Sequence, residues 1–375
     1  FEMRPRNRAG DAESFFNGIG EVEFLSSGTL GESFSWFTAM ALNEASSRSF
    51  ESETEIERMF WQYTPRFFGW EPGTLAVRVG VIETRAAPFR DHIRLTVTPS
   101  IADRFAIVPT GNFHRLHKEA GLEIFGAHNG PGGKGGIRWS FGVVNGIAGG
   151  FSRFTSNANG YDASAISSNM SGQWGVFDLN NNKDVYARVN YKIGGMGVLG
   201  GVEEVGLVSE KNWQDNSLTL GAFLYRGNAP YFEDPVGGTG FHENGNRFWR
   251  FGGEARLDYW NFSLKGAATF YRDNPAHNVT IGNNSGDDFD ADIYTFIADY
   301  VAWPWLIPSI RVEHVDPDYD AGDWPSLTRF STDLTLLLRA NIKARIGGNV
   351  TSGDWKGQRP AAFDDSYHLS MDVAF

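Results

Sequence analysis

The chain contains no cysteine among its 375 residues. This absence excludes a disulfide framework, a cysteine-ligated zinc site and a c-type haem attached covalently to this chain. The sequence also lacks any run near the roughly 18 consecutive apolar residues that a transmembrane helix requires, which excludes a helical membrane protein. A net charge of −12 argues against nucleic acid as a general partner.

Glycine and aromatic residues are abundant, with 45 glycines and 14% Phe, Trp and Tyr, and the mean hydropathy is −0.32. Runs of about ten residues alternate apolar and polar positions, as in 74–83, 261–272 and 341–351. A strand places successive side chains on opposite faces. In a membrane barrel one of these faces meets lipid and the other lines the lumen, so the average hydropathy resembles that of a soluble protein.

A soluble β-sandwich would show the same alternation, but two features favour a barrel. Runs of about ten residues at a tilt cross a bilayer, and the connections alternate between short turns and long polar loops, as in outer-membrane barrels. We therefore predict an all-β fold: a transmembrane antiparallel β-barrel of about sixteen strands, forming a single domain over 1–375. The predicted strands are 1–8, 16–27, 32–42, 55–65, 74–84, 119–128, 137–146, 183–193, 215–226, 247–258, 261–272, 290–302, 306–315, 328–340, 341–351 and 365–375.

Short connections are expected at 28–31, 66–73, 129–136, 259–260, 303–305 and 340–341, with 194–214 as an unusually long periplasmic turn. The longer, extracellular connections are expected at 43–54, 85–118, 147–182, 227–246, 273–289, 316–327 and 352–364. Aromatic residues gather at three of the short turns, as expected for a girdle at the membrane interface. They are Phe67, Phe68, Trp70, Tyr259, Trp260, Trp303 and Trp305.

The last predicted strand alternates and ends on Phe375. This ending resembles the terminal signal by which the bacterial assembly machinery recognises outer-membrane barrels. Two further stretches, 28–37 and 62–80, resemble the first periplasmic hairpins of sixteen-strand porins, including the phosphate-selective group. The resemblance implies an integral protein of a Gram-negative outer membrane, in contact with lipid and lipopolysaccharide. It also implies passive diffusion of small hydrophilic solutes or ions, and suggests a homotrimer.

In porins the long loop between the fifth and sixth strands folds into the barrel and narrows the pore. The resemblance places that constriction at 85–118 here, where basic residues outnumber acidic ones. A basic constriction raises the local concentration of anions and would give a mild anion preference. The alternative is that the loop lies outside and its charges are solvated. The candidate constriction residues are Arg90, His92, Arg94, Arg104, His114, Arg115, His117 and Lys118.

Sorting strand residues by face gives a mixed, nearly balanced lumen wall with a slight basic excess. The candidates for the basic wall residues are Arg78, Arg138, Arg188, Lys192, Arg250, Arg256, Lys265, Arg311, Arg339, Lys343 and Arg345. Their acidic counterparts are Glu21, Glu23, Glu123, Glu254, Asp258, Asp299, Glu313, Asp333 and Asp372. The overall negative charge is then expected in the loops, in clusters at 287–290 and 316–323.

Other classes of function have weaker support. The cluster at 316–320 lacks the full calcium-loop spacing, and His114 and His117 have no evident third metal ligand. His368 lies near Ser370 but no nucleophile motif accompanies them, so we expect neither an enzyme nor a bound cofactor or metal. A second hypothesis remains open. More distantly, the strands resemble barrels that sheathe a multihaem c-type cytochrome in an electron-transfer conduit, and a sixteen-strand lumen has room for a partner.

Overall fold

The computed structural model describes residues 2–5, 12–15, 21–44, 52–66, 70–86, 88–89, 118–145, 182–199, 214–234, 239–274, 288–319, 326–339, 342–353 and 365–373. In these ranges the chain forms one 17-stranded sheet. The strands are β1 (Glu2–Pro5), β2 (Ala12–Phe15), β3 (Glu21–Leu30), β4 (Phe34–Glu44), β5 (Ser52–Tyr63), β6 (Ala76–Glu83), β7 (Lys118–Asn129), β8 (Lys134–Val144), β9 (Asp184–Met196), β10 (Ser217–Asp234), β11 (Thr239–Tyr259), β12 (Phe262–Asn274), β13 (Phe289–Tyr300), β14 (Leu306–Tyr319), β15 (Leu327–Arg339), β16 (Ile342–Ser352) and β17 (Ser366–Val373).

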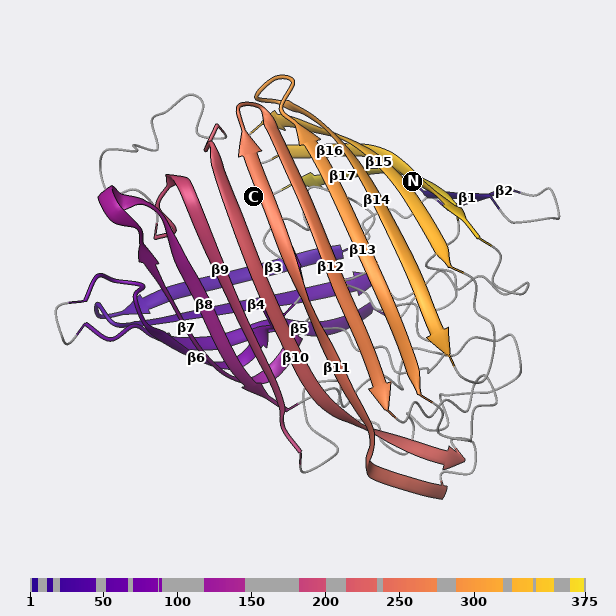
Figure 1. Ribbon diagram of the computed structural model, residues 1–375, viewed down its shortest axis with the longest axis horizontal. Coiled ribbons are helices and arrows are strands. Elements are labelled where there is room, and N and C mark those ends of the chain that lie inside the picture. The colour runs from indigo at the N-terminus through magenta and orange to yellow at the C-terminus, as the bar shows by residue number, and fades with distance from the viewer. Residues whose placement is uncertain are drawn as a thin grey trace.

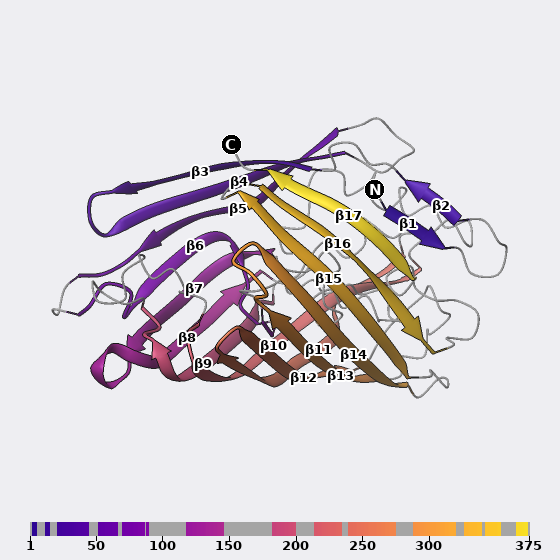
Figure 2. The same cartoon turned by 90° about the horizontal axis from the view of Figure 1, so that it is seen from above.

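Every strand from β3 to β17 pairs antiparallel with its neighbour in the sequence. β17 then pairs with β1, and β1 with β2. The sheet curves strongly, and its strands follow one another around the wall of a barrel (Figure 1, Figure 2). The residue pairings described include no ladder from β3 to β2 or β17 that would complete the ring.

The predicted fold class is confirmed: an all-β antiparallel barrel wall without a long helix in its described parts. The short strand β1 falls within the predicted first strand, 1–8, whereas β2 lies between the first and second predicted strands. Beyond these two, each long strand from β3 to β17 overlaps one predicted range. Among the described residues no helix is both long and apolar enough to cross a bilayer.

In these strands large apolar side chains are exposed and polar side chains are buried, which is the reverse of the pattern in a soluble sheet. In β13, Phe296 is 48% exposed whereas the neighbouring Thr295 is 4% exposed. In β15 the buried positions include Arg329, Ser331 and Asp333, all on one face because they are two residues apart. Large apolar side chains thus cover the outside of the wall, and polar and charged side chains are buried on its other side, here called the inner face.

The connections on one edge of the barrel are short, as predicted. A two-residue turn joins β11 to β12, and only two residues separate β15 from β16 in the sequence. The short 3-10 helix η2 (Pro131–Gly133) joins β7 to β8. The connection from β9 to β10 is the long one on this edge, as expected for 194–214. On the opposite edge the connections at 84–117 and 145–183 are long.

One predicted loop, 227–246, is wrong. β10 and β11 continue through most of it and form a ribbon that projects beyond the neighbouring strands (Figure 1). Pro230 lies in this stretch, and proline cannot donate to a β-ladder. The register shifts between Ala229 and Tyr231, so Pro230 falls in an irregularity of the ladder and the pairing resumes beyond it.

Candidate functional site: the inner face of the barrel wall

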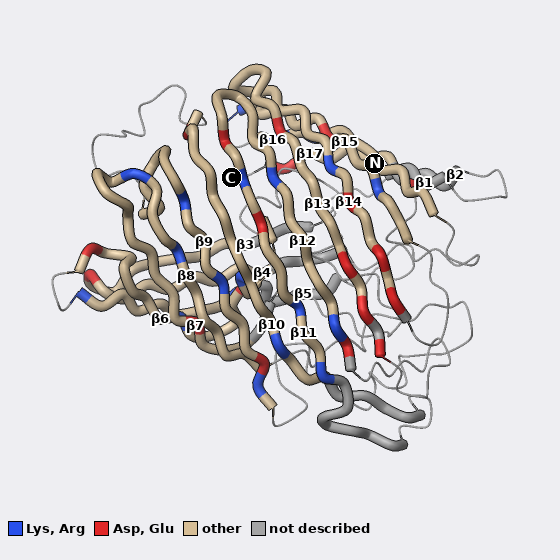
Figure 3. Tube along the Cα trace, in the orientation of Figure 1, with Lys and Arg blue, Asp and Glu red and all other residues tan. Residues whose placement is uncertain are grey.

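The inner face is lined by ionisable side chains that are almost fully buried. Charged positions recur along most of the strands, and positions of opposite sign lie on neighbouring strands (Figure 3). A buried charge is tolerated only when it is paired and hydrogen-bonded, so the pairing of these groups decides what the face can do. The buried ionisable residues of the described strands are Glu123, Asp184, Arg250, Asp258, Lys265, Asp273, Asp299, Arg311, Glu313, Arg329, Asp333 and His368.

Several of these groups form one-to-one pairs between adjacent strands. Arg250 of β11 contacts Asp273 of β12 with both terminal nitrogens, in the bidentate arrangement that arginine makes with a carboxylate. Lys265 of β12 lies 2.5 Å from Asp299 of β13, which also accepts a 2.6 Å hydrogen bond from Ser309. These pairs are neutral, and they cross-link the wall at the level of the side chains.

Other carboxylates are shared by two cations. Glu313 lies 3.0 Å from Arg311 and 2.6 Å from Arg329. Asp372 lies 2.8 Å from Lys343 and 3.1 Å from Arg345. In each of these clusters two cationic side chains contact the same carboxylate.

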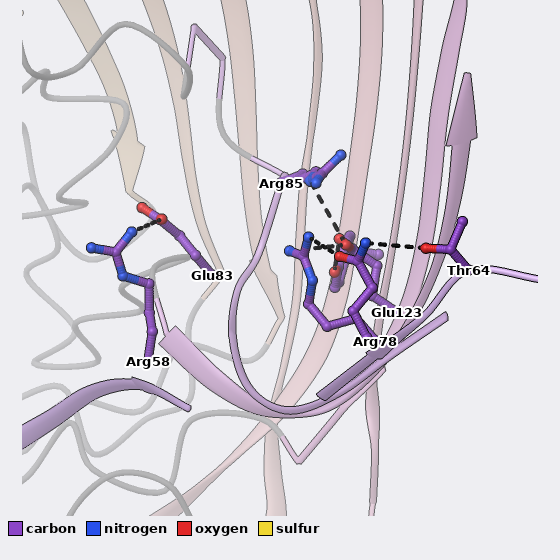
Figure 4. Close-up of polar contacts among 8 residues, drawn as sticks. Arg58, Thr64, Arg78, Glu83, Arg85 and Glu123 are labelled. Atoms are coloured by element: carbon purple, nitrogen blue, oxygen red, sulfur yellow. Dashed lines mark hydrogen bonds and ion pairs between the residues drawn. The ribbon is translucent and has the colours of Figure 1, made fainter. Parts of the chain in front are cut away.

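A third shared carboxylate is Glu123, which lies 3.6 Å from Arg78 and 3.7 Å from Arg85 (Figure 4). These separations are longer than a charge-assisted hydrogen bond. The guanidinium of Arg78 is held between the rings of Phe60 and Phe125, at 4.3 and 4.7 Å from their centroids. Stacking and Coulomb attraction together therefore fix this arginine while leaving the cluster with a net positive charge.

Three carboxylates of the inner face reach past an adjacent strand to a group on the strand beyond it, and each passes over a glycine. Glu123 of β7 accepts a 2.5 Å hydrogen bond from the Tyr186 hydroxyl of β9, and Gly142 of β8 pairs with both residues. A methyl group at Gly142 would lie 2.0 Å from Cε1 of Tyr186. The glycine is therefore needed for the ring to cross the strand.

The same arrangement recurs twice. Asp333 of β15 lies 2.9 Å from Nε2 of His368 of β17, over Gly347 of β16. Glu254 of β11 accepts a 3.0 Å hydrogen bond from the side-chain amide of Asn190 of β9, over Gly221 of β10. In each case the side chains lie along the wall.

The predicted constriction loop 85–118 is described only at its ends. At its start, Thr84, Ala86 and Phe89 are buried, and the Phe89 amide donates a 2.7 Å hydrogen bond to Glu254. The described part of this segment therefore lies against inner-face groups of β9 and β11. The candidates Arg90, His92, Arg94, Arg104, His114, Arg115 and His117 lie outside the described residues, and Lys118 begins β7.

Most predicted wall residues are brought together in pairs or clusters, but two lie apart from them. Arg138 is exposed and donates to the Val198 carbonyl at 2.6 Å. Arg339 is exposed at the end of β15, next to a register shift between Leu337 and Arg339. Both stand at the short-turn edge. Side chains at positions 21 and 23 are not described.

The sequence reasoning missed Arg329, Asp273 and Asp184 as inner-face residues. The alternation could have identified Arg329, because it stands four residues before Asp333, a predicted inner-face residue, and positions an even number apart in a strand share a face. Asp273 lies near the end of β12, at a position that the sequence predicted as part of a loop. Asp184 begins β9 and was predicted as the second residue of that strand.

The predicted acidic cluster at 316–323 lies partly in a strand. Asp316 and Asp318 belong to β14 and pair in register with Asp292 and Asp290 of β13. Arg272 lies 2.9 Å from Asp292 and 3.3 Å from Asp290, which offsets part of this like-charge repulsion. No group of three or more His, Asp and Glu side chains suited to a metal ion is found in the described ranges.

Aromatic residues lie at the turns on the short-turn edge. Trp303 and Trp305 stack at 5.6 Å between β13 and β14, and Tyr259 and Trp260 lie 6.5 Å apart between β11 and β12. All four side chains are exposed, as is Trp70, the first described residue after Phe67 and Phe68, which lie outside the described ranges.

Asp215, in the turn before β10, also lies on this edge. It is 2.5 Å from Lys192 and accepts hydrogen bonds from the Met196 amide and the Ser217 hydroxyl. Burial by itself would raise the pKa of Asp215, but these donors outweigh it and hold the pKa below the ordinary value of 3.8.

No protein-family model and no curated protein sequence matches the chain. Several solved structures are similar to this chain in fold. An anion-selective porin from Comamonas acidovorans superposes with a TM-score of 0.56 at 10% identity, covering 95% of this chain and 89% of that one. OmpF of Salmonella typhi, in complex with daunomycin, gives 0.53 at 11% identity, covering 99% and 93%.

OprB of Pseudomonas putida also gives a TM-score of 0.53 at 10% identity, covering 100% of this chain and 91% of that one. The chain therefore has the porin fold. Identities this low establish the fold alone, so the function must be argued from the residues of the wall.

Proposed function

We propose that the protein is a porin of a Gram-negative outer membrane, through which small hydrophilic solutes or ions diffuse passively. The observation that carries this proposal is the inverted polarity of the wall. Exposed Phe, Leu and Trp side chains cover the outside, whereas Arg, Lys, Asp and Glu are buried on the inner face. In water this large apolar outer surface would be unfavourably exposed, whereas a bilayer covers it and leaves the polar face toward the lumen.

We propose a mild preference for anions that would come from three local clusters, because the fully buried part of the inner face holds seven carboxylates and four Arg or Lys side chains. The clusters at Glu123, Glu313 and Asp372 each hold two cations for one carboxylate. A local excess of one charge in a low-dielectric wall concentrates ions of the opposite sign. Segment 85–118 adds basic residues if it forms the constriction, as the resemblance to sixteen-strand porins implies.

The proposed location of the protein and its assembly rest on the aromatic residues and on the resemblance to porins. The aromatic residues of the short turns suit the periplasmic interface of the bilayer, and the opposite edge would face outward toward lipopolysaccharide. Phe375 would serve recognition by the barrel assembly machinery. We propose a homotrimer, as the likeness to porins implies.

The alternative, a sleeve around a multihaem cytochrome, is less favoured by the geometry. A sleeve needs its lumen free for the partner. Among the described residues 84–86, 88 and 89, Phe89 contacts Glu254 of the inner face, on the side that a partner would occupy. This contact supports a porin in which a loop narrows the lumen.

Two experiments test the proposal. Liposomes containing the purified protein should swell in isosmotic solutions of small neutral sugars, at a rate that falls with solute size. Mild-detergent purification from the native membrane, followed by a haem stain and mass spectrometry, should show the barrel alone. A c-type cytochrome present at a stoichiometric amount would overturn the porin in favour of the sleeve.

A further inference from the structure

The carboxylate of Glu254 connects three segments that are far apart in the sequence. It pairs with Arg188 and accepts a 3.0 Å hydrogen bond from Asn190, both on β9. Its other oxygen accepts a 2.7 Å hydrogen bond from the backbone amide of Phe89. Only 5% of the Glu254 side chain is exposed, so these donors, not water, satisfy its charge.

Residues 84–86, 88 and 89, here called the loop start, follow β6 and meet strands that are not neighbours of β6, which pairs with β5 and β7. A second contact reinforces the first. Arg188 donates a 3.1 Å hydrogen bond to the backbone carbonyl of Arg85. The loop start is thus held at both ends by one ion pair, Arg188 with Glu254.

Gly221 makes this contact possible. It lies on β10 between Asn190 and Glu254, and a methyl group there would lie 2.7 Å from Cγ of Glu254. The absence of a side chain lets Glu254 extend across β10 to Arg188. The anchor is therefore built from three adjacent strands of the wall.

The backbone of the loop start is strained where it meets the anchor. Phe89 has a φ of +53°, in the left-handed region that favours glycine. A bulky residue keeps such a conformation only when its surroundings impose it. The hydrogen bond to Glu254 and the burial of the Phe89 ring are the two constraints that the structure provides.

We propose that Glu254 is a positioning residue that fixes the loop start against the barrel wall. It thereby sets the place at which the chain enters 90–117. The consequence for the pore rests on the proposed function, in which 85–118 narrows the lumen. Loss of the anchor would then make the open-channel current noisier and the single-channel conductance less uniform.

The chain has no cysteine, so one introduced cysteine provides a unique site for thiol labelling. Ala86 is fully buried in the loop start, and Ala86→Cys provides a single thiol whose labelling by a hydrophilic methanethiosulfonate reports release of the segment. We expect slow labelling with Glu254 present and labelling about tenfold or more faster with Glu254→Ala, because a buried hydrogen bond to a charged group is lost. Glu254→Gln keeps an acceptor for the Phe89 amide and should give an intermediate rate.

The matched control is Glu313→Gln. It removes one negative charge from the inner face in the same way, but the partners of Glu313 are Arg311 and Arg329 on β14 and β15. Labelling of the thiol at position 86 should stay within about twofold of the parent. Mobility in an unheated gel shows whether each barrel is folded, and Glu254→Gln carries the test if Glu254→Ala does not fold.

Equal labelling rates in the parent and both Glu254 variants would overturn the anchor, as would equal acceleration by Glu313→Gln. The labelling result does not depend on ion conduction. A folded barrel that fails to conduct therefore refutes the proposed function and leaves the anchor to be judged on labelling alone.

Discussion

The hydroxyl of Tyr186 donates a 2.5 Å hydrogen bond to the carboxylate of Glu123 across the whole width of an intervening strand, over Gly142. Because Glu123 also attracts Arg78 and Arg85, one carboxylate links four strands or segments of the wall. The chain thus uses lumen-side glycines as crossing points for polar side chains.

Replacement of Gly142 by alanine should destabilise the barrel by about 1–3 kcal/mol, because the new methyl group would overlap the Tyr186 ring and force it away from Glu123. Denaturant unfolding in detergent measures this change. The matched control is Gly266→Ala on β12, where an added Cβ meets nothing within 4 Å. Equal losses at the two glycines would contradict the crossing-point account.

Removal of one partner from a buried ion pair should be far more damaging than removal of one from a surface pair. Asp273→Ala leaves Arg250 buried without its bidentate partner and should cost about 3–5 kcal/mol. Glu32→Ala breaks an exposed contact with Arg66 and should cost less than about 1 kcal/mol. The unfolding free energies of both variants decide this, and similar values would show that the inner-face pairs are solvated.

Asp215 should give the barrel a pH-dependent contribution to stability. Its pKa is lowered in the folded state, so the contribution is fully present above the unfolded value near 3.8 and is lost as the pH falls through the folded pKa. The difference in unfolding free energy between the parent and Asp215→Asn should therefore shrink as the pH is lowered from 5 to 3, a range of two units around the ordinary carboxyl pKa of about 4. A constant difference would contradict the assignment.

The sequence predicted the position of most strands because period-two alternation is a local signal. It mispredicted the ribbon of β10 and β11, since Pro230 reads as a loop residue unless the register of its partner strand is known. The same alternation identified many of the residues on the inner face, but it could not show which of them contact one another. The Tyr186–Glu123 and Asp333–His368 contacts each join two strands that are separated by a third. Predicting them requires the register of all three strands, which alternation within one strand does not give.

Basic residues of segment 85–118 should set the ion preference if this segment forms the constriction. The combined substitution of Arg90, Arg94 and Arg104 by alanine removes three positive charges and should shift the reversal potential in a salt gradient toward cations. Replacing Arg66, an exposed residue paired with Glu32 outside that segment, is the control and should leave the potential unchanged. An unaltered reversal potential in the triple variant would refute a basic constriction there.

The central claim is that the charged inner face encloses a water-filled passage. Purified, folded protein added to a planar lipid bilayer in symmetric salt tests it most directly. We expect stepwise, stable increases in current that rise with salt concentration, and a weak anion preference when a salt gradient is imposed. Insertion of the folded barrel without any conductance would contradict it.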